Sequence, residues 1–450
     1  MSLRVAVIGA GIVGVTTAYE LVSDGHEVTV FERRGSVAAE TSFANAGIVA
    51  PGYVTPWAAP GMPAKVLGHL FSRHAPVRVN ARLDAATLAW MWRWWRACRL
   101  STYQANRTRM QRLAMYSKQR LNHITRSLQL DYERSEGYLV LLRTAQDLEL
   151  VQPGLAVLRE LGVKFDTLDG ERCIAVEPGL NPDIALHAGI HLPHDEVGNC
   201  RQFAHLLRNA AQERGARFRF HTDVQRIVPA THPRLVHVYA PPEESTLLTP
   251  NADASPADFA PTEPLPFEPI TETFDAVVVC AALQSSALLA PHGLKLPLAP
   301  VYGYSVTAPM RHHENHPDSG PRSGLMDERY KVAISRMGSR IRVAGGAELG
   351  GSPQQHNAAA LDTLYKVLHD WFPGVARMSH AQRWKGARPM LPDGPPVLGR
   401  SGIDGVWLNL GHGSSGWALS CGSARVVADL LSNRQPGIDT EGLGVERLRR

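Results

Sequence analysis

The first forty residues alternate short apolar runs with one longer amphipathic stretch. Residues 5–8 form an apolar, β-rich run, and residues 27–31 form a second one. Between them, residues 12–22 carry apolar side chains at helical spacing, and residues 24–26 have the composition of a turn. The pattern predicts a strand, a helix and a second strand, which is the unit from which parallel sheets are built.

Glycines mark the turn from the first strand into the helix. Gly9, Gly11 and Gly14 have the G-x-G-x-x-G spacing, and Glu32 directly follows the second strand. The first glycine permits a tight turn, the second lets backbone approach a pyrophosphate, and the third allows close packing of helix on strand. The acid accepts hydrogen bonds from ribose hydroxyls. We therefore expect a bound dinucleotide. The acid disfavours a 2′-phosphate and so NADP, which leaves FAD and NAD open.

Further along the chain, helical and strand-like patterns follow one another without an internal repeat. The predicted helices cover 84–130, 146–161, 199–215 and 361–371, and the predicted strands cover 136–143, 185–192, 217–228, 274–280, 302–308, 330–336, 341–345 and 406–409. Residues 411–417 form a second glycine-rich turn that opens a helix. Rossmann-like pieces at both ends thus enclose β-rich segments.

This order predicts an α/β fold, α+β overall, with a discontinuous nucleotide domain and an inserted, mostly antiparallel sheet. We assign the Rossmann-type domain to residues 1–55, 145–228, 274–292 and 385–450, and the substrate domain to 56–144 and 293–384. Residues 229–273 hold ten prolines among polar residues, so we interpret them as a hairpin extended by a flexible insertion.

Composition narrows the class of protein. The chain has 450 residues, 44% of them hydrophobic, and a net charge of +5, which is ordinary for a globular protein. Lysines and arginines are dispersed, so we expect no nucleic-acid partner. The five cysteines form no C-x-x-C pair, so we expect a reduced compartment and no metal site. We find neither a signal peptide nor an apolar run of transmembrane length, and expect a cytoplasmic protein.

Several stretches together resemble the FAD-dependent D-amino-acid oxidase superfamily, and within it the branch of the bacterial D-amino-acid dehydrogenase small subunit. Besides the segment from Gly9 to Glu32, they are Thr41-Ser-Phe-Ala-Asn-Ala-Gly47, Pro51-Gly-Tyr53, Met326-Asp-Glu-Arg-Tyr-Lys331, Arg388-Pro-Met-Leu-Pro-Asp393 and Gly411-His-Gly-Ser-Ser-Gly-Trp417. The matching residues run the full length of the chain.

The resemblance implies non-covalently bound FAD and oxidation of a C–N bond. Hydride passes from the substrate α-carbon to flavin N5, and the imine hydrolyses to an oxo acid and an amine or ammonia. The implied substrate is a D-amino acid with a free carboxylate, or a secondary amino acid such as a proline derivative. Electrons then go to a non-oxygen acceptor such as a quinone or an electron-transfer protein. An oxygen-using oxidase of glycine or sarcosine type, an RNA-modifying flavoprotein and a non-catalytic partner subunit are the alternatives.

The resemblance also implies site residues. Arg388 and Tyr330 would bind the substrate carboxylate, with Tyr53 and Tyr304 as pocket walls. His412 is expected to be positional. The expected cofactor-binding residues are Gly9, Ala10, Gly11, Ile12, Val13, Gly14, Glu32, Arg33, Ser42, Asn45, Ala46, Gly47, Val224, Gly411, His412, Gly413, Ser414, Ser415 and Gly416.

The sequence departs from the family pattern in three places, one of which is the length of the Pro-rich insertion at residues 229–273. Ala281-Ala282-Leu283 replaces an Ala-x-Gly, which affects packing near the adenine, and Leu391 replaces a threonine, which we expect to change the polarity of the substrate pocket. Cys421 follows the second glycine turn. We interpret it as a buried hydrophobe, with a thioether to flavin as the alternative.

Residues 88–99 combine tryptophans with arginines at helical spacing. Leu88, Met91, Trp92 and Trp95 share one face, while Trp90 and Trp94 lie on another. We favour packing of this helix within the protein. A peripheral contact with the inner face of an anionic membrane is the alternative.

Overall fold

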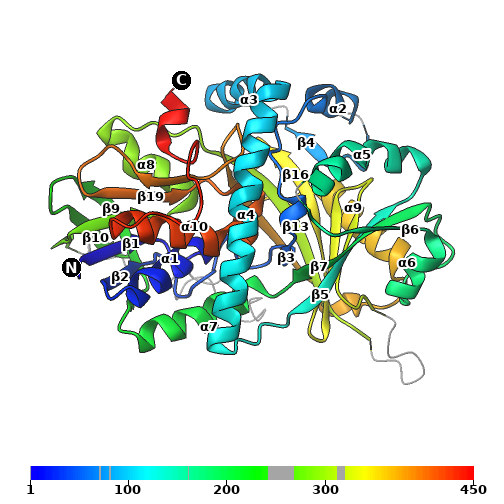
Figure 1. Ribbon diagram of the computed structural model, residues 1–450, viewed down its shortest axis with the longest axis horizontal. Coiled ribbons are helices and arrows are strands. Elements are labelled where there is room, and N and C mark those ends of the chain that lie inside the picture. The colour runs from blue at the N-terminus through cyan, green and yellow to red at the C-terminus, as the bar shows by residue number, and fades with distance from the viewer. Residues whose placement is uncertain are drawn as a thin grey trace, which may run out of the picture.

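The computed structural model describes residues 2–69, 72–80, 83–160, 162–241, 268–311 and 320–449. These residues form two parts that lie side by side, one built on a six-stranded sheet and the other on a ten-stranded sheet (Figure 1). Helix α4 (Leu100–Leu128) runs almost the whole height of the molecule where the two parts meet.

The six-stranded sheet is the expected nucleotide-binding sheet. Its strands are β1 (Arg4–Ile8), β2 (Glu27–Phe31), β8 (Arg217–Arg219), β12 (Ala276–Val279), β18 (Val397–Arg400) and β19 (Val406–Leu410). Their order is β18-β19-β12-β1-β2-β8, and every pairing except that of β18 with β19 is parallel. The central strands are apolar at nearly every position because both faces of the sheet are covered.

Different layers cover the two faces of this sheet. Helices α1 (Ile12–Ser23), α7 (Cys200–Glu213) and α10 (Gly416–Leu431) share one hydrophobic core with it, and α4 packs against α10. On the opposite face lie helix α8 (Ser285–Leu289) and a small antiparallel sheet of β9 (Thr222–Val228), β10 (Arg234–Tyr239) and β11 (Ile270–Thr273). Between β10 and β11, residues 242–267 of the predicted insertion lie outside the described residues.

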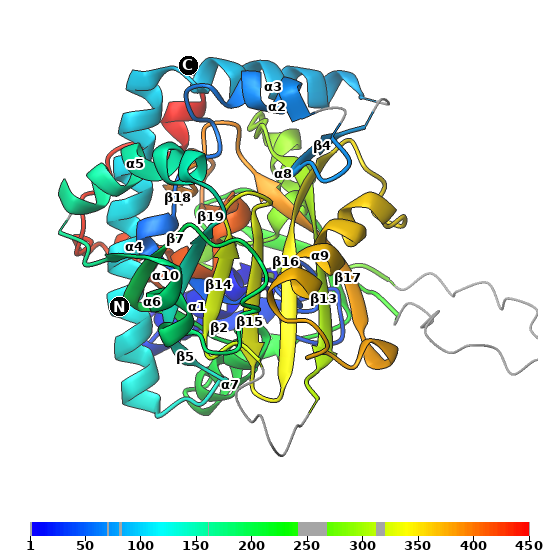
Figure 2. The same cartoon turned by 90° about the vertical axis from the view of Figure 1, so that its right-hand side faces the viewer.

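The ten-stranded sheet stands beside the first (Figure 2). Its path runs through β17 (Gln382–Met390), β13 (Ala299–Pro309), β16 (Arg340–Leu349), β15 (Val332–Met337), β14 (Gly324–Asp327), β5 (Ser135–Leu142), β7 (Ala188–Val197) and β3 (Ile48–Val49), while β4 (Val77–Val79) pairs with β16 and β6 (Asp166–Leu168) with β7. Only the β5–β14 and β4–β16 pairings are parallel. Helix α9 (Ala358–Trp371) packs on one face of it.

The remaining helices lie around the ten-stranded sheet and at the ends of strands. They are α2 (Met62–His69), α3 (Ala85–Ala97), α5 (Ala145–Glu160) and α6 (Gly170–Val176), with 3-10 turns at Pro51–Tyr53, Ala282–Gln284, Ala290–His292, Met378–His380, Gly413–Ser415 and Val445–Arg449. Within the described ranges, no helix combines the length and the apolar character needed to cross a bilayer.

The predicted fold class is confirmed, but the sheets divide the chain differently from the predicted domain boundaries. Strands β6 and β7 pair in the ten-stranded sheet, although residues 145–228 were assigned to the nucleotide domain, and the same holds for β3 and β17. Helix α4, assigned to the substrate domain, shares its core with α1 and α10. Alternating hydrophobicity identifies a strand but not the sheet in which it pairs.

Candidate active site

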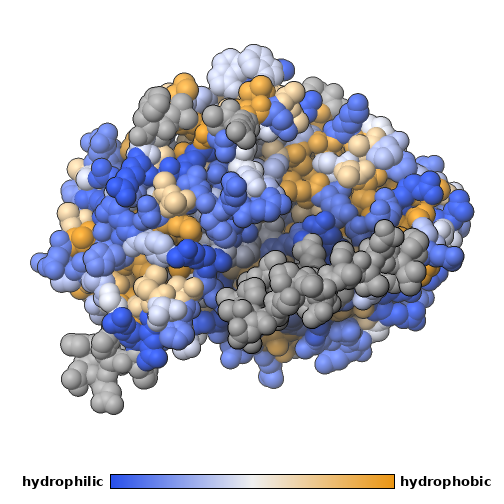
Figure 3. Space-filling model, turned by 180° about the vertical axis from the view of Figure 1, so that it is seen from behind, coloured by the Kyte–Doolittle hydropathy of each residue, from blue (hydrophilic) through white to orange (hydrophobic). Residues whose placement is uncertain are grey.

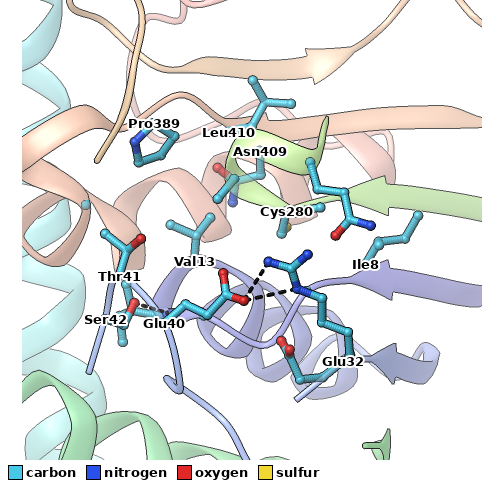
Figure 4. A pocket seen from close by; sticks show the side chains of 18 of the residues that line it. Ile8, Val13, Glu32, Glu40, Thr41, Ser42, Cys280, Pro389, Asn409 and Leu410 are labelled. Carbon is cyan, nitrogen blue, oxygen red and sulfur yellow. Dashed lines mark hydrogen bonds and ion pairs between the residues drawn. The ribbon is translucent and has the colours of Figure 1, made fainter. Parts of the chain in front are cut away.

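Two hollows between the parts of the molecule share a wall. The first lies on the six-stranded sheet and is lined by both glycine-rich turns (Figure 4). The second lies between those turns and the ten-stranded sheet. Ile12, Thr41, Ser42, Gly413 and Gly416 line both of them. The two hollows therefore form one elongated cavity, whose two ends we call the nucleotide end and the substrate end.

The three glycines of the first turn have separate roles. A Cβ at Gly14 would lie 1.8 Å from the carbonyl oxygen of Gly9, so helix and strand could not pack as closely. Gly9 has a φ of +99°, and its Cβ would lie 2.7 Å from the carbonyl oxygen of Cys280. A Cβ at Gly11 would meet only the Ser42 hydroxyl, at 3.6 Å. Gly11 therefore leaves space in the cavity, whereas Gly9 and Gly14 allow the close packing of backbone segments.

Glu32 lines the nucleotide end and is fixed by backbone. Its carboxylate accepts hydrogen bonds from the N–H of Ala10 at 2.7 Å and of Arg34 at 2.9 Å. Burial raises the pKa of this carboxyl. Ala10 lies behind the carboxylate and does not line the cavity, and neither does Gly14. Arg33 does line it, and pairs with Glu40 at 2.6 Å. Figure 4 shows the Glu40 side chain extending into the cavity below Val13.

The far nucleotide end contains Val224, as the resemblance implies, together with polar residues that the sequence did not indicate. The Gln284 amide donates to the Asp223 carboxylate at 3.0 Å, and both side chains line the cavity. Ala281 and Ala282 line it as well. Ala282 has a φ of +48°, which a glycine would adopt more easily, whereas the departure from the family pattern falls on the next residue, Leu283.

The six residues 411–416 of the second glycine turn, which we expect to bind the cofactor, all line the cavity. Gly411 has a φ of +78°, and a Cβ there would lie 2.5 Å from the Leu391 side chain. His412 is buried, and its Nε2 lies 2.9 Å from the Ser423 hydroxyl. Burial lowers the pKa of His412 to about 3, so its imidazole is neutral and holds the turn against α10.

Residues 41–47, which we call the 41–47 loop, link the two ends of the cavity. The Ser42 hydroxyl accepts a hydrogen bond from the N–H of Ile12 at 3.1 Å and so caps the start of α1. The Asn45 side chain accepts from the N–H of Gly47 at 3.0 Å. Asn45, Ala46 and Gly47 all line the substrate end.

Small residues form the floor of the substrate end. They come from four neighbouring strands of the ten-stranded sheet and are Gly303, Ala333, Ala344, Gly345 and Gly386. Gly303 lies opposite Gly386 in the register, and Ala333 lies opposite Ala344. The glycines make room for two large side chains, because a Cβ at Gly303 would meet the Arg388 guanidinium and a Cβ at Gly386 would meet the Trp384 ring.

Arg388 stands at the edge of this floor. Its Nη1 donates to the carbonyl oxygen of Gly346 at 2.9 Å, and a Cβ at Gly303 would lie 2.3 Å from its Nη2. No carboxylate of the described residues lies within ion-pair distance of it. Burial lowers the pKa of Arg388 to about 10, so the guanidinium remains charged at neutral pH. It is therefore a half-buried cation that lines the cavity and has no counterion among the described residues.

The predicted tyrosines divide into two groups. Tyr53 and Tyr304 line the substrate end. The Tyr53 ring stacks edge-on against Tyr138, with ring centroids 5.6 Å apart, and the Tyr304 hydroxyl donates to Glu348. Tyr330 does not line the cavity.

Tyr330 lies in the turn between β14 and β15, on the side away from the cavity. Its ring packs against the Arg143 guanidinium at 5.1 Å and the Lys366 ammonium at 5.7 Å. Neighbouring residues of the turn point to opposite sides, so Lys331 lines the cavity in its place. Tyr330 therefore anchors the turn and is not placed to touch a substrate.

Sequence reasoning missed several residues of the substrate end. They are Tyr138, Met326, Lys331 and Trp384. Lys331 and Met326 lie within a stretch that carried the resemblance, but the spacing there did not indicate which side chain faces inward. Tyr138 and Trp384 lie on strands whose neighbours in space are distant in sequence, so no local signal marked them.

Leu391 and Cys421 both lie in the core. Leu391 packs beneath the second glycine turn and does not line the cavity, so the expected change in pocket polarity is wrong. Cys421 is 1% exposed within the core under α1 and α10, and it lines neither end of the cavity. Its position matches the buried-hydrophobe interpretation.

The donor set of the cavity fits FAD. Gly11 leaves room for a pyrophosphate at the start of α1, and Glu32 offers carboxylate oxygens beside it. The second glycine turn and the substrate end provide the adjoining space for the rest of the cofactor. Within the described residues, no group of three or more metal-ligating side chains is placed to hold an ion.

Comparison with known proteins indicates the same cofactor as the residues that line the cavity. The family model for FAD dependent oxidoreductases matches residues 4–430. A D-amino acid dehydrogenase of Cereibacter sphaeroides is 43% identical over 447 residues, which cover 99% of this chain and 95% of the relative. A D-amino acid dehydrogenase of Bradyrhizobium diazoefficiens is 40% identical over 447 residues, which cover 99% of both chains.

Solved structures share the fold at low sequence identity. Glycine oxidase from Geobacillus kaustophilus has a TM-score of 0.72 at 19% identity, and the match covers 99% of this chain and 98% of the other. L-proline dehydrogenase from P. horikoshii has a TM-score of 0.71 at 16% identity, and the match covers 100% and 98%.

Proposed function

This chain belongs to the FAD dependent oxidoreductase family, and from that premise we propose that it is a D-amino-acid dehydrogenase. The observation that carries the proposal is Arg388, whose guanidinium lines the substrate end and has no counterion among the described residues. Full-length identity of about two fifths to D-amino acid dehydrogenases supports it.

When bound, FAD supplies the two-electron oxidant that accepts hydride from the substrate α-carbon. Arg388 forms two parallel, charge-assisted hydrogen bonds with the substrate carboxylate and so fixes the position of the α-carbon. Tyr53 and Tyr304 form walls that exclude water and limit the orientations of the substrate side chain. The chain thus binds and orients the substrate, and the oxidising power comes from the cofactor.

The described walls of the substrate end include no aspartate, glutamate or histidine. No side chain there is placed to act as a strong base, so we infer that the amino group reacts in its neutral form. The turn at 411–416 presents backbone N–H groups at the start of α10, where they favour negative charge. His412 keeps this turn in place as a neutral group.

Steady-state assays of the purified holoenzyme with pairs of D- and L-amino acids test this function. With an artificial electron acceptor, D-amino acids should be oxidised and their enantiomers should not. Hydrogen peroxide released at the same rate as oxo acid would favour the oxygen-using oxidase. A preference for L-enantiomers would contradict the proposal.

For the electron acceptor, we propose a quinone or electron-transfer protein at a membrane surface. The exposed face of α3 supports this, because Leu88 is 53%, Trp92 59% and Trp95 50% exposed. Trp92 and Trp95 stack with centroids 5.0 Å apart, and Arg93 and Arg96 are exposed beside them. Figure 3 shows pale and hydrophobic residues gathered at the upper end of the molecule, where Figure 1 places α3.

The same helix also packs inward, as the sequence favoured. Trp90 and Trp94 are 3% and 7% exposed, and the Trp90 indole donates to the carbonyl oxygen of Met390 at 3.0 Å. One face of α3 is therefore anchored and the other is free to meet the interfacial region of an anionic bilayer.

Vesicles of phosphatidylglycerol and phosphatidylcholine at low salt test the membrane contact. We expect the holoenzyme to co-sediment with them and the double variant W92S/W95S to remain in solution with its amino-acid oxidation intact. Equal sedimentation of the two proteins would refute the contact.

A further inference from the structure

Behind the 41–47 loop lies a second buried guanidinium, which belongs to Arg342 of β16. Arg342 is 6% exposed, and it lies two residues before Ala344 on the same face of the strand. Its Nη1 donates to the carbonyl oxygen of Asn45 at 2.9 Å, and its Nε donates to the Thr307 hydroxyl at 2.8 Å. Within the part of the chain that the structure describes, no carboxylate lies within ion-pair distance of it.

Arg342 belongs to a row of three polar side chains beneath the loop. In the register of the sheet, Arg342 lies opposite Thr307 on one side and Ser335 on the other. The Ser335 hydroxyl donates to the carbonyl oxygen of Ala46 at 2.7 Å. Arg342 and Ser335 therefore bind the carbonyl oxygens of two successive loop residues, Asn45 and Ala46. Both carbonyl oxygens point toward the sheet.

The next carbonyl of the loop is bound as well. The oxygen of Gly47 accepts from the Trp417 indole at 3.2 Å and from the N–H of Gly198 at 2.8 Å. The loop residues 45–47 line the substrate end, while Arg342 and Ser335 do not. The loop thus separates the cavity from a buried positive charge, with two of its carbonyl dipoles aligned toward that charge.

The surroundings of Arg342 do not neutralise this charge. Arg340 faces the same region but is paired with Glu133 at 2.8 Å. The Arg201 guanidinium lies 4.1 Å above the Phe43 ring, and the Cys200 thiol is buried nearby. Burial lowers the pKa of Arg342 to about 10, which leaves it charged at neutral pH. The net charge behind the loop is therefore positive.

We propose that Arg342 is a positioning residue that raises the reduction potential of the bound flavin by placing uncompensated positive charge behind the 41–47 loop. Two-electron reduction adds negative charge to the ring, and a nearby buried cation stabilises that charge more than it stabilises the neutral oxidised ring. Arg388 faces the substrate carboxylate, so the cation behind the loop remains uncompensated when substrate is bound.

The test compares holoenzyme variants that separate charge from hydrogen bonding. R342Q removes the charge and keeps a donor, whereas R342K keeps the charge. S335A removes one loop hydrogen bond without changing charge. The readouts are the flavin reduction potential, measured by equilibration with a reference dye, and the dissociation constant for sulfite, which adds to electron-poor flavins.

We expect R342Q to lower the potential and to weaken sulfite binding roughly tenfold, which is the order of effect of one buried charge at effective dielectric constants near 20. R342K and S335A should stay close to the wild type. If R342Q does not fold, T307D provides the test. This variant places a carboxylate against the Arg342 guanidinium, so it should also lower the reduction potential.

Unchanged potential and sulfite affinity in R342Q, or in T307D, would overturn the proposal. A potential in R342K as low as that in R342Q would also overturn it, because geometry and not charge would then be responsible. The inference rests on the proposed flavin chemistry, but neither readout needs an amino acid. A protein with the wrong substrate assignment could still show the Arg342 effect, so the two failures are distinguishable.

Discussion

Replacing Arg388 with methionine removes the proposed carboxylate anchor while keeping much of its volume. The guanidinium is held by the Gly346 carbonyl at 2.9 Å and has room only because residue 303 is glycine. A bidentate pair with a carboxylate contains two charge-assisted hydrogen bonds, each worth about 1.5–3 kcal/mol. Loss of about 4 kcal/mol corresponds to roughly a thousandfold decrease in kcat/KM, since every 1.4 kcal/mol is a factor of ten.

Anaerobic stopped-flow measurement of flavin reduction over a range of D-amino-acid concentrations gives the effect directly. R388K should retain more activity than R388M, because it keeps the charge but loses the planar fork. R383M is the matched control, since Arg383 lies on the same strand and is exposed. If R388M binds FAD and reduces it with kcat/KM within threefold of the wild type, Arg388 does not bind the carboxylate and the site assignment is wrong.

Three further predictions concern the cofactor turns. G14A should destabilise the fold by about 3 kcal/mol or more, because its Cβ would lie 1.8 Å from a backbone oxygen, whereas G11A should fold normally and bind FAD more weakly; urea unfolding and FAD titration separate the two. A282G should raise the free energy of unfolding by up to about 1 kcal/mol in urea titrations, because it relieves a φ of +48°. His412 has a pKa of about 3 in the fold, so only the unfolded chain takes up its proton between pH 6.5 and 3, and stability falls as the pH falls through that range. H412Q should therefore lose less stability than the wild type between pH 6.5 and 4.5, by up to about 1.4 kcal/mol per pH unit, and equal pH profiles would contradict this.

The glycine turns and Glu32 of the nucleotide end could be predicted from sequence because their chemistry is local, whereas Asp223 and Gln284 could not. Gly9, Gly11 and Gly14 act within one turn, and Glu32 follows a strand that pairs directly with β1. The second glycine turn is equally local. Ala10 was predicted to bind the cofactor. Its N–H instead donates to the Glu32 carboxylate, and its side chain is buried in the core.

The substrate end could be predicted only in part, because strands and a loop that are distant in sequence build it. Arg388 was identified through the resemblance, but the glycine that makes room for it lies on another strand. Tyr330 was predicted to contact the substrate, but the neighbouring residue Lys331 lines the cavity. Neighbouring side chains point in different directions, so an error of one residue selects the wrong side chain. The domain boundary at residue 145 failed for a related reason, because pairing partners in a sheet are not encoded locally.

Arg342 shows the limit of sequence reasoning most clearly. Nothing in its neighbourhood along the chain distinguishes it from Arg340, two residues earlier. Only the register of β13, β16 and β15 brings it beneath the 41–47 loop, and only burial leaves it without a counterion.

The central claim is that this protein transfers hydride from a D-amino acid to its own FAD. The most direct test mixes the holoenzyme without oxygen with a panel of D-, L- and N-alkyl amino acids and follows the flavin absorbance near ~450 nm. We predict rapid bleaching by D-amino acids, no bleaching by their L-enantiomers, and one equivalent of oxo acid per flavin. An absorbance that no member of the panel changes, or that only L-amino acids change, would contradict the account.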